Sequence, residues 1–276
     1  MDLNWLESII YSVISGFTEI LPVPSRAHNA LYLFLIGSES APILDLFIHI
    51  AVLFALLMNT QNYLSAVKRA RKLAQIPPSR RKRQPNYRLL ADWKLIRVAS
   101  IPVILSVVVS AFTYQLSGRF QFLAIFLFLN GILLYITGHI PIGSKNSRDM
   151  TSLEGFLIGV AASLSCLPGF SRMGSGLSVA LMRGSSKTTA LTWMLIITIP
   201  AMVGVCVLDI ISIASVGMGS FGFLALAQCF VCAVIAYIFA SMAISFMRFL
   251  AIKLGFSAFS YYSFGLALFA FVLFMI

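Results

Sequence analysis

Six apolar segments of about 20 residues or more dominate this sequence, namely 43–66, 96–117, 120–141, 188–208, 222–246 and 256–276. A hydrocarbon core of about 30 Å is crossed by roughly 20 helical residues, so each segment is long enough to span a membrane. The chain is 59% hydrophobic and 11% charged, against about 45–50% and about 25% in soluble domains. This composition excludes a water-soluble globule. We therefore predict an all-α polytopic membrane protein in which residues 1–276 form a single membrane domain with six transmembrane helices.

Two further apolar stretches, 3–36 and 153–183, are each interrupted near the middle by Pro, Ser and Arg. The interruptions at 21–26 and 167–172 share the pattern L-P-x-x-S-R, with the second copy 146 residues after the first. Proline disfavours a continuous helix, so we expect each stretch to form two short helices that meet at the break. The shared pattern indicates a duplication, although a chance match is an alternative.

The two broken stretches are interpreted as re-entrant helical hairpins. Three predicted spans lie between them, so the two hairpins would enter the membrane from opposite faces. This is the inverted-topology repeat found in many transporters, in which broken helices meet near the midplane around a ligand. The first repeat would cover about 1–66 and the second about 153–208, with C-terminal spans in 222–276.

Basic residues are concentrated in one segment of the chain. The net charge is +11, and eleven of the 20 Lys and Arg lie between Lys68 and Arg97. A basic run can bind nucleic acid, anionic lipid or a cytoplasmic partner. Between two apolar spans, a cytoplasmic loop at 67–95 that follows the positive-inside rule is the more economical interpretation, and we expect no nucleic-acid partner.

The other charges agree with this topology. Three pairs of basic residues fall on the same side of the predicted membrane as 67–95: Lys145 and Arg148, Arg183 and Lys187, Arg248 and Lys253. The predicted outer loop 209–221 contains no Lys or Arg. We therefore predict that both termini face outside, that the first hairpin enters from outside and that the second enters from inside.

Ionisable and hydroxyl residues cluster at the two breaks. They are Glu19, Ser25, Arg26, His28, Ser171 and Arg172. Charged side chains at membrane depth are costly and mark a functional site by default. Two guanidinium groups, the backbone N–H groups around Gly169 and the helix N-termini after each break would together favour phosphate or diphosphate.

These residue types can carry out phosphoryl chemistry on a lipid head group. Glu19 could hold a divalent cation against phosphate oxygens or relay a proton, and His28 could act as an acid or base. Ser25 lies three residues before His28, on the same helical face, and its hydroxyl is a candidate nucleophile.

Each of these residues also has a structural interpretation. Ser25 and Ser171 could cap the helices that follow the breaks. Arg172 could bind exposed carbonyls or pair with Glu19, and His28 could be a satisfied interior histidine. For His49, which an apolar run separates from the breaks, a buried hydrogen-bonded role is favoured over catalysis.

The segment Gly16–His28, G-F-T-E-I-L-P-V-P-S-R-A-H, and the segment Leu167–Gly174, L-P-G-F-S-R-M-G, resemble the undecaprenyl-diphosphate phosphatases associated with bacitracin resistance. The second motif, with its sequel Ile199-Pro200-Ala201-Met202, is the more specific of the two. The resemblance covers nearly the whole chain in hydropathy and motif order.

This resemblance implies an integral phosphatase of the bacterial inner (plasma) membrane that hydrolyses undecaprenyl (polyprenyl) diphosphate to the monophosphate. The lipid carrier of cell-wall synthesis would thereby be recycled. It further implies the fold inferred above, a site that opens outward and a Mg²⁺ or Ca²⁺ cofactor. The expected partners are the lipid substrate, the bilayer and, as an assembly to test, a second copy in a homodimer.

The resemblance also assigns site residues. Glu19 matches the second acid of a Glu-x-x-x-Glu motif, which makes it the candidate metal ligand. Ser25 and His28 match the first Pro-rich motif, and Ser171 and Arg172 match the second. The predicted catalytic residues are therefore Glu19, Ser25, His28 and Arg172.

The predicted phosphate-binding residues are Arg26, Gly169, Ser171 and Arg172.

The sequence departs from the family pattern in both motifs and before them. Ser15 stands where the first acid is expected, the first Pro-rich motif reads P-V-P-S-R-A-H and so loses one Ser and gains the cation Arg26, and Met173 replaces a serine in the second motif. The loss of a negative charge and the gain of a positive one favour anion binding and weaken metal recruitment. A non-hydrolytic transporter or flippase for a lipid phosphate or other organic anion is therefore the alternative function. The change Ser15→Glu should distinguish the two.

Overall fold

The computed structural model describes residues 3–141, 143–216 and 222–275, and within these ranges the elements are helices. Six helices are long and apolar enough to cross a membrane, which confirms the all-α membrane fold with six spans. Parts of three predicted segments lie outside the described residues: residues 1–2 of the first repeat, 217–221 of the outer loop and 276 of the last span. The six helices are α3 (Pro42–Gln75), α4 (Tyr87–Thr113), α5 (Phe120–Gly138), α8 (Lys187–Val216), α9 (Phe223–Lys253) and α10 (Ala258–Met275).

The two interrupted stretches each form a pair of short helices, as predicted. The first pair is α1 (Trp5–Thr18) and α2 (Ser25–Ile36), and the second is α6 (Ser152–Ser163) and α7 (Arg172–Met182). The two helices of each pair pack against each other. We call the connections between them the first corner (residues 19–24) and the second corner (residues 164–171), the latter including the short helix η3 (Leu164–Cys166).

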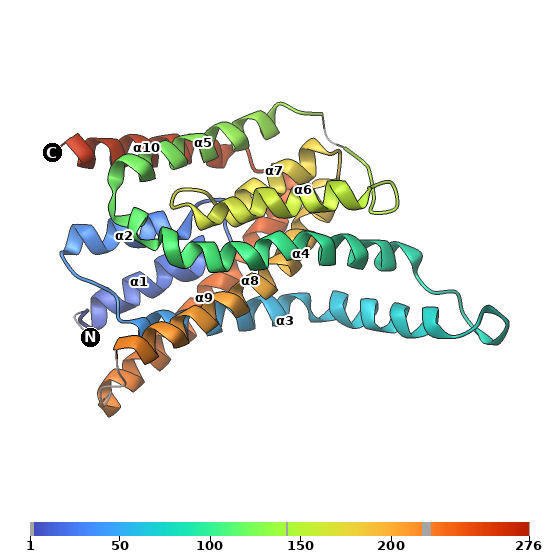
Figure 1. The fold of residues 1–276 in the computed structure, drawn as a ribbon, viewed down its shortest axis with the longest axis horizontal. Helices are drawn as coiled ribbons and strands as arrows, with labels where there is room; N and C mark the ends of the chain where they lie inside the picture. The colour runs from blue at the N-terminus through green and yellow to red at the C-terminus, as the bar shows by residue number, and fades with distance from the viewer. Residues whose placement is uncertain (1–2, 142, 217–221, 276) are drawn as a thin grey trace.

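The helices lie side by side along the long axis of the molecule (Figure 1). α10 packs against α5 along one side, and α3 packs against both α8 and α9 on another. α1 packs against α9, and α6 packs against α4. The short helices therefore lie among the long ones, which brings the two corners into the interior of the bundle.

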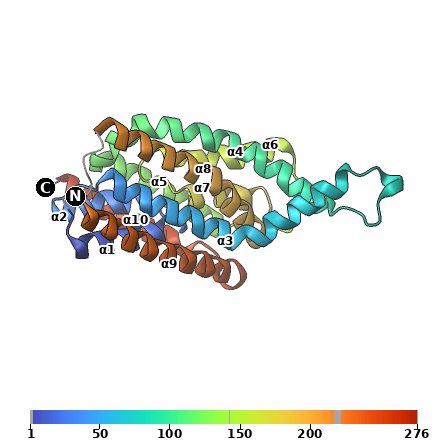
Figure 2. The same ribbon diagram turned by 90° about the horizontal axis from the view of Figure 1, so that it is seen from below.

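The basic segment is largely helical, which corrects the loop predicted at 67–95. α3 has 34 residues and is about 51 Å long at ~1.5 Å per residue, more than a ~30 Å hydrocarbon core requires. Its last turns and the first turns of α4 project from the bundle as a helical hairpin (Figure 2). The connection itself is confined to residues 76–86 and includes the short helix η1 (Pro78–Arg80).

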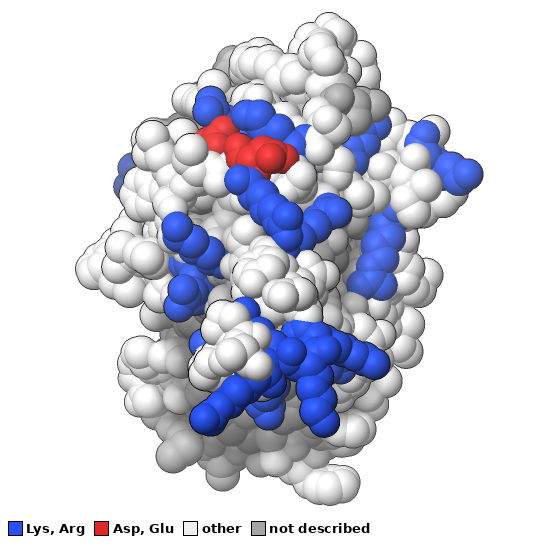
Figure 3. All heavy atoms as spheres, turned by 90° about the vertical axis from the view of Figure 1, so that its right-hand side faces the viewer, with Lys and Arg blue, Asp and Glu red and all other residues white. Residues whose placement is uncertain are grey.

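Arginine and lysine side chains gather over the end of the bundle from which this hairpin projects. Figure 3 shows them spread over that face, around a group of acidic side chains. Glu154, at the start of α6, accepts hydrogen bonds from Arg183 Nη2 at 3.0 Å and Nε at 3.1 Å. Lys145 Nζ lies 3.5 Å from the same carboxylate. The last turn of α10 lies at the opposite end of the molecule (Figure 1).

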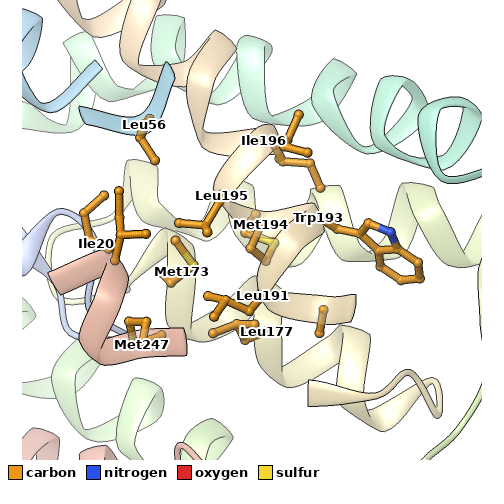
Figure 4. Packing of buried hydrophobic residues seen from close by; sticks show 14 of the residues in the cluster. Ile20, Leu56, Met173, Leu177, Leu191, Trp193, Met194, Leu195, Ile196 and Met247 are labelled. Atoms are coloured by element: carbon orange, nitrogen blue, oxygen red, sulfur yellow. The ribbon is translucent and has the colours of Figure 1, made fainter. Parts of the chain in front are cut away.

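The main core cluster encloses the first corner. Ile20 and Leu21 are buried there together with Met173 of α7, and Figure 4 shows Ile20 and Met173 beside Leu195 and Met247.

Small residues allow helices to approach closely, as is common in membrane proteins. At Gly159 of α6, a Cβ atom would lie 2.2 Å from the carbonyl oxygen of Ala99 in α4. The helices α6 and α4 are thus in close backbone contact at this position.

Candidate active site

The first corner places a carboxylate beside a hydroxyl. Glu19 follows the last residue of α1 in a helical conformation, and Pro24, which precedes α2, provides no side-chain cap. Ser25 is the first residue of α2, and its hydroxyl donates a hydrogen bond to Glu19 Oε1. Ser25 is therefore not the cap of its helix, and its hydroxyl is directed to an ionisable group.

The second corner is fastened to the first by Ser171. Its hydroxyl accepts a hydrogen bond of 3.0 Å from the backbone N–H of Gly174, which makes Ser171 the N-cap of α7. The same hydroxyl donates to the carbonyl oxygen of Leu21 at 3.2 Å. The backbone N–H of Ser171 donates to Asn130 Oδ1 of α5 at 3.1 Å. Ser171 thus has a structural role at the point where the two corners touch.

Arg172 brings a guanidinium group to the carboxylate of the first corner. Its Nη1 lies 3.8 Å from Glu19 Oε2, and only 13% and 14% of the two side chains are exposed. Nη1 also contacts Met202 Sδ of α8 at 3.6 Å. The buried Nε has no hydrogen-bond partner among the described residues. Because an unpaired buried N–H is costly, Nε is a donor suited to an anionic ligand.

Glu19, Ser25 and Arg172 line one cavity of about 440 Å³. Its walls come from both corners, from α1 and α2, from the first turns of α3, and from the last turns of α4 and α8. The other ends of α3, α4 and α8 belong to the basic end of the bundle. The cavity therefore lies toward the end of the molecule that is opposite the basic face.

Two predicted phosphate-binding residues have different positions. Arg26 lines the cavity, and its Nη1 donates to the carbonyl oxygen of Cys166 in the second corner at 3.5 Å. Gly169 has φ of +104°, and a Cβ atom there would lie 2.8 Å from the backbone nitrogen of Leu127. Gly169 is absent from the described cavity lining. Its conformation and its contact with α5 require glycine at this position.

His28 lies away from the described lining of the cavity. Its Nδ1 is 2.7 Å from the carbonyl oxygen of Pro24, and its Nε2 is 2.6 Å from the hydroxyl of Tyr262. The two rings are stacked, with centroids 5.6 Å apart. This placement differs from the predicted acid–base position, because α2 turns this side chain toward α10.

Sequence reasoning missed the acidic residues that share the cavity. His49 Nδ1 and Asp209 Oδ2 are 2.6 Å apart, joining α3 to α8. Asp45 accepts hydrogen bonds from the hydroxyls of Tyr11 and Ser40, each at 2.8 Å. Asp209 was expected in an outer loop, but α8 continues past it to Val216. The signal that could have found these residues is an ionisable side chain within an apolar run.

Comparison with known proteins settles the family. The profile of the family described as bacitracin resistance protein BacA matches residues 8–269, nearly the whole chain. The chain belongs to the BacA family. This confirms the resemblance drawn from the two corner motifs.

Named relatives of this BacA family member agree with that assignment. An undecaprenyl-diphosphatase of Methanobrevibacter smithii is 30% identical over 219 residues, covering 76% of this chain and 78% of the relative. Undecaprenyl-diphosphatase 1 of Shouchella clausii is 28% identical over 276 residues, 98% of this chain and 96% of the relative. An undecaprenyl-diphosphatase of Alkaliphilus metalliredigens is 29% identical over 224 residues, 78% and 80% of the two chains.

Ser15 is the position at which the sequence comparison predicts an acid. It is buried, and its hydroxyl donates to Asn29 Oδ1 at 3.0 Å. The described residues contain no group of three or more His, Cys, Asp or Glu side chains placed to hold a metal ion. In the first corner, Glu19 is therefore the carboxylate that lines the cavity. This donor set fits a divalent cation that takes most of its ligands from phosphate oxygens and water, as Mg²⁺ often does.

Proposed function

We propose that this protein hydrolyses a polyprenyl diphosphate, such as undecaprenyl diphosphate, to the monophosphate within the membrane. The observation that carries the proposal is the meeting of Glu19, Ser25 and Arg172 at one cavity. These residues come from two corners far apart in the sequence. Relatives that align over most of the chain bear the name undecaprenyl-diphosphatase, which supplies the substrate class.

The cations of the cavity bind the diphosphate. Arg172 offers its unpaired Nε and Arg26 adds a second guanidinium, and such groups match the geometry of phosphate oxygens. Charge that develops on the transferring phosphoryl group is stabilised by donors held in place beforehand. Binding by Arg172 also draws its charge toward the substrate, which leaves Glu19 free to act as a base.

Ser25 is the nucleophile of the proposed reaction. Its hydroxyl already donates to Glu19, the arrangement of a nucleophile with an adjacent base. The bond from Ser25 Oγ to the terminal phosphorus forms while the bond from that phosphorus to the bridging oxygen breaks. The hydroxyl proton passes to Glu19, and polyprenyl monophosphate leaves. Water then cleaves the phosphoserine and releases inorganic phosphate.

A Mg²⁺ or Ca²⁺ ion would be held by Glu19 together with the phosphate oxygens of the substrate. When bound, it supplies positive charge that neutralises the diphosphate. His28 serves in this scheme as a positioning residue, because its contact with the carbonyl oxygen of Pro24 fixes the first turn of α2. Ser171 likewise positions Arg172 by capping α7.

The proposal includes an orientation of the protein in the membrane. With the basic end in the cytoplasm, α1–α2 and α6–α7 are re-entrant hairpins that enter from the outer and inner sides, and both termini face outside. The cavity then lies toward the outer leaflet of a bacterial plasma membrane, where the lipid head group would enter. Dimerisation remains a prediction, and cross-linking of the protein in membranes would test it.

Phosphate release by the purified protein in liposomes tests the function. With a long-chain prenyl diphosphate and Mg²⁺, the unmodified protein should release one phosphate per substrate. Arg172→Ala should lower kcat/KM by about 100-fold or more, as loss of a transition-state donor does. Arg172→Lys should restore little, because lysine lacks the planar fork.

Arg148→Ala is the matched control, since Arg148 lies over the ring of Tyr87 at the basic end. Its activity should equal that of the unmodified protein. Movement of the lipid across the bilayer without phosphate release would contradict this proposal and favour the alternative function, a non-hydrolytic transporter.

A further inference from the structure

The cavity contains a histidine and a carboxylate that the proposed reaction has not used. His49 Nδ1 lies 2.6 Å from Asp209 Oδ2, and 17% and 16% of these side chains are exposed. Both residues line the same cavity as Glu19, Ser25 and Arg172. A carboxylate that accepts the Nδ1 hydrogen fixes the tautomer of an imidazole and leaves Nε2 as the proton acceptor.

The two-step reaction requires a second base. After Ser25 has attacked the terminal phosphorus, Glu19 holds the serine proton and cannot accept another. Asp45 is engaged by the hydroxyls of Tyr11 and Ser40, and Asp209 holds His49. Among the described ionisable residues that line the cavity, the imidazole of His49 is therefore the group suited to accept a proton from water.

The distribution of charge favours water at His49. Arg26 and Arg172 attract the phosphate oxygens, whereas Asp45 and Asp209 repel them. Asp45 lies one turn before His49 on α3, and Asp209 faces it from α8. The anionic head group is thus directed to the guanidinium groups, and the space beside His49 is left to a neutral ligand.

We propose that His49, oriented by Asp209, is the general base that activates the water that cleaves the phosphoserine. This inference rests on the proposed function. The bond from the water oxygen to phosphorus forms while the bond from Ser25 Oγ to phosphorus breaks. The water proton passes to His49 Nε2, and Glu19 returns its proton to Ser25 Oγ. Inorganic phosphate leaves, and the proton on His49 is then released to solvent.

The variant His49→Asn tests this assignment. An asparagine amide can still donate to Asp209, but it cannot accept a proton from water. With a substrate labelled in the terminal phosphate, the variant should release one equivalent of polyprenyl monophosphate and retain the label on Ser25. Steady-state phosphate release should fall by about 10²- to 10⁴-fold, the usual contribution of a general base.

A second variant tests whether the effect of His49→Asn arises from misfolding. Asp209→Asn keeps the volume, but its amide would donate to Nδ1 and force the hydrogen onto Nε2. It should show the same retained label and slow turnover, with an unchanged unfolding temperature. His139→Asn is the matched control, because His139 caps the distant end of α5, and its turnover should match that of the unmodified protein.

Two outcomes would overturn the assignment. One is steady-state turnover of His49→Asn within twofold of the unmodified protein. The other is loss of the first equivalent of monophosphate together with turnover, in a variant that unfolds at the normal temperature. An unmodified protein that releases no phosphate would instead contradict the proposed function itself, so the two failures are distinguishable.

Discussion

The hydroxyl of Ser171 donates a hydrogen bond of 3.2 Å to the carbonyl oxygen of Leu21, across 150 residues of sequence. This bond joins the second corner to the first and sets Arg172, the next residue, beside Glu19. The serine of the first corner, Ser25, instead donates to Glu19. Equivalent serines of the two motifs therefore make different kinds of contact.

Removal of each serine should have a different effect. Ser171→Ala loses the N-cap of α7 and should lower the free energy of unfolding by about 1 kcal/mol, seen as a lower thermal unfolding midpoint. Ser25→Ala removes the proposed nucleophile and should abolish turnover while the midpoint stays unchanged. A stable, fully active Ser25→Ala variant would contradict the assigned nucleophile.

Ser15→Glu should increase the affinity of the site for Mg²⁺. Residue 15 lies in α1 and residue 19 directly follows its last residue, so the two positions are four apart. Two carboxylates there would share one helix face beside Asn29. The Mg²⁺ concentration that gives half-maximal phosphate release should fall relative to the unmodified protein. Ser15→Gln, equal in size but uncharged, is the control and should not show this shift. An unchanged Mg²⁺ requirement in Ser15→Glu would argue against a cation at Glu19.

Gly159→Val should separate α6 from α4. A Cβ atom at Gly159 would lie 2.2 Å from the carbonyl oxygen of Ala99 and 2.7 Å from Pro102 Cγ, so the backbones must move apart. Overpacking of this kind costs about 1–3 kcal/mol, and the unfolding midpoint should fall. Gly265→Val is the control, since no described atom beyond its chain neighbours and the backbone of its own helix turn lies within 4 Å of its Cβ position. An equal effect of both changes would refute this packing argument.

Acidification should weaken the basic end of the bundle. Hydrogen bonds from the Thr151 backbone N–H, and then from Arg183, lower the pKa of Glu154. A lowered carboxyl pKa contributes stability above the ordinary value of about 4.3, and this contribution is lost as the pH falls through the lowered value. The unfolding midpoint should decline in that range. Glu154→Gln should show a smaller decline, and an identical pH profile would contradict the prediction.

The six spans and the two helix breaks could be predicted because hydropathy and proline act locally. The helix ends were harder to predict. Hydropathy marks where the chain leaves the membrane, whereas the helix continues wherever its residues favour it. The segment 67–75, rich in Ala, Lys, Arg and Leu, therefore extends α3, and α8 likewise carries Asp209 beyond the predicted end of the span.

The candidate site was predictable only where the residues are local. Glu19 and Ser25 lie in one motif, and the corners share a pattern, so their meeting could be inferred. The pair His49 and Asp209 depends on α3 packing against α8, which no local pattern reveals. For His28 the local pattern was misleading. Its spacing of three residues from Ser25 predicted a shared helix face, but α2 directs its ring to Tyr262.

The bond between the corners uses a side chain from one copy of the motif and a main-chain atom from the other. Any residue at position 21 would present that carbonyl oxygen, but position 171 needs a hydroxyl. The first motif thus supplies the proposed nucleophile and its base, Ser25 and Glu19 beside it, whereas the second supplies Arg172 and the serine that holds the two corners together. The same substitution, serine to alanine, should therefore have different consequences in the two motifs, because the two hydroxyls have different partners.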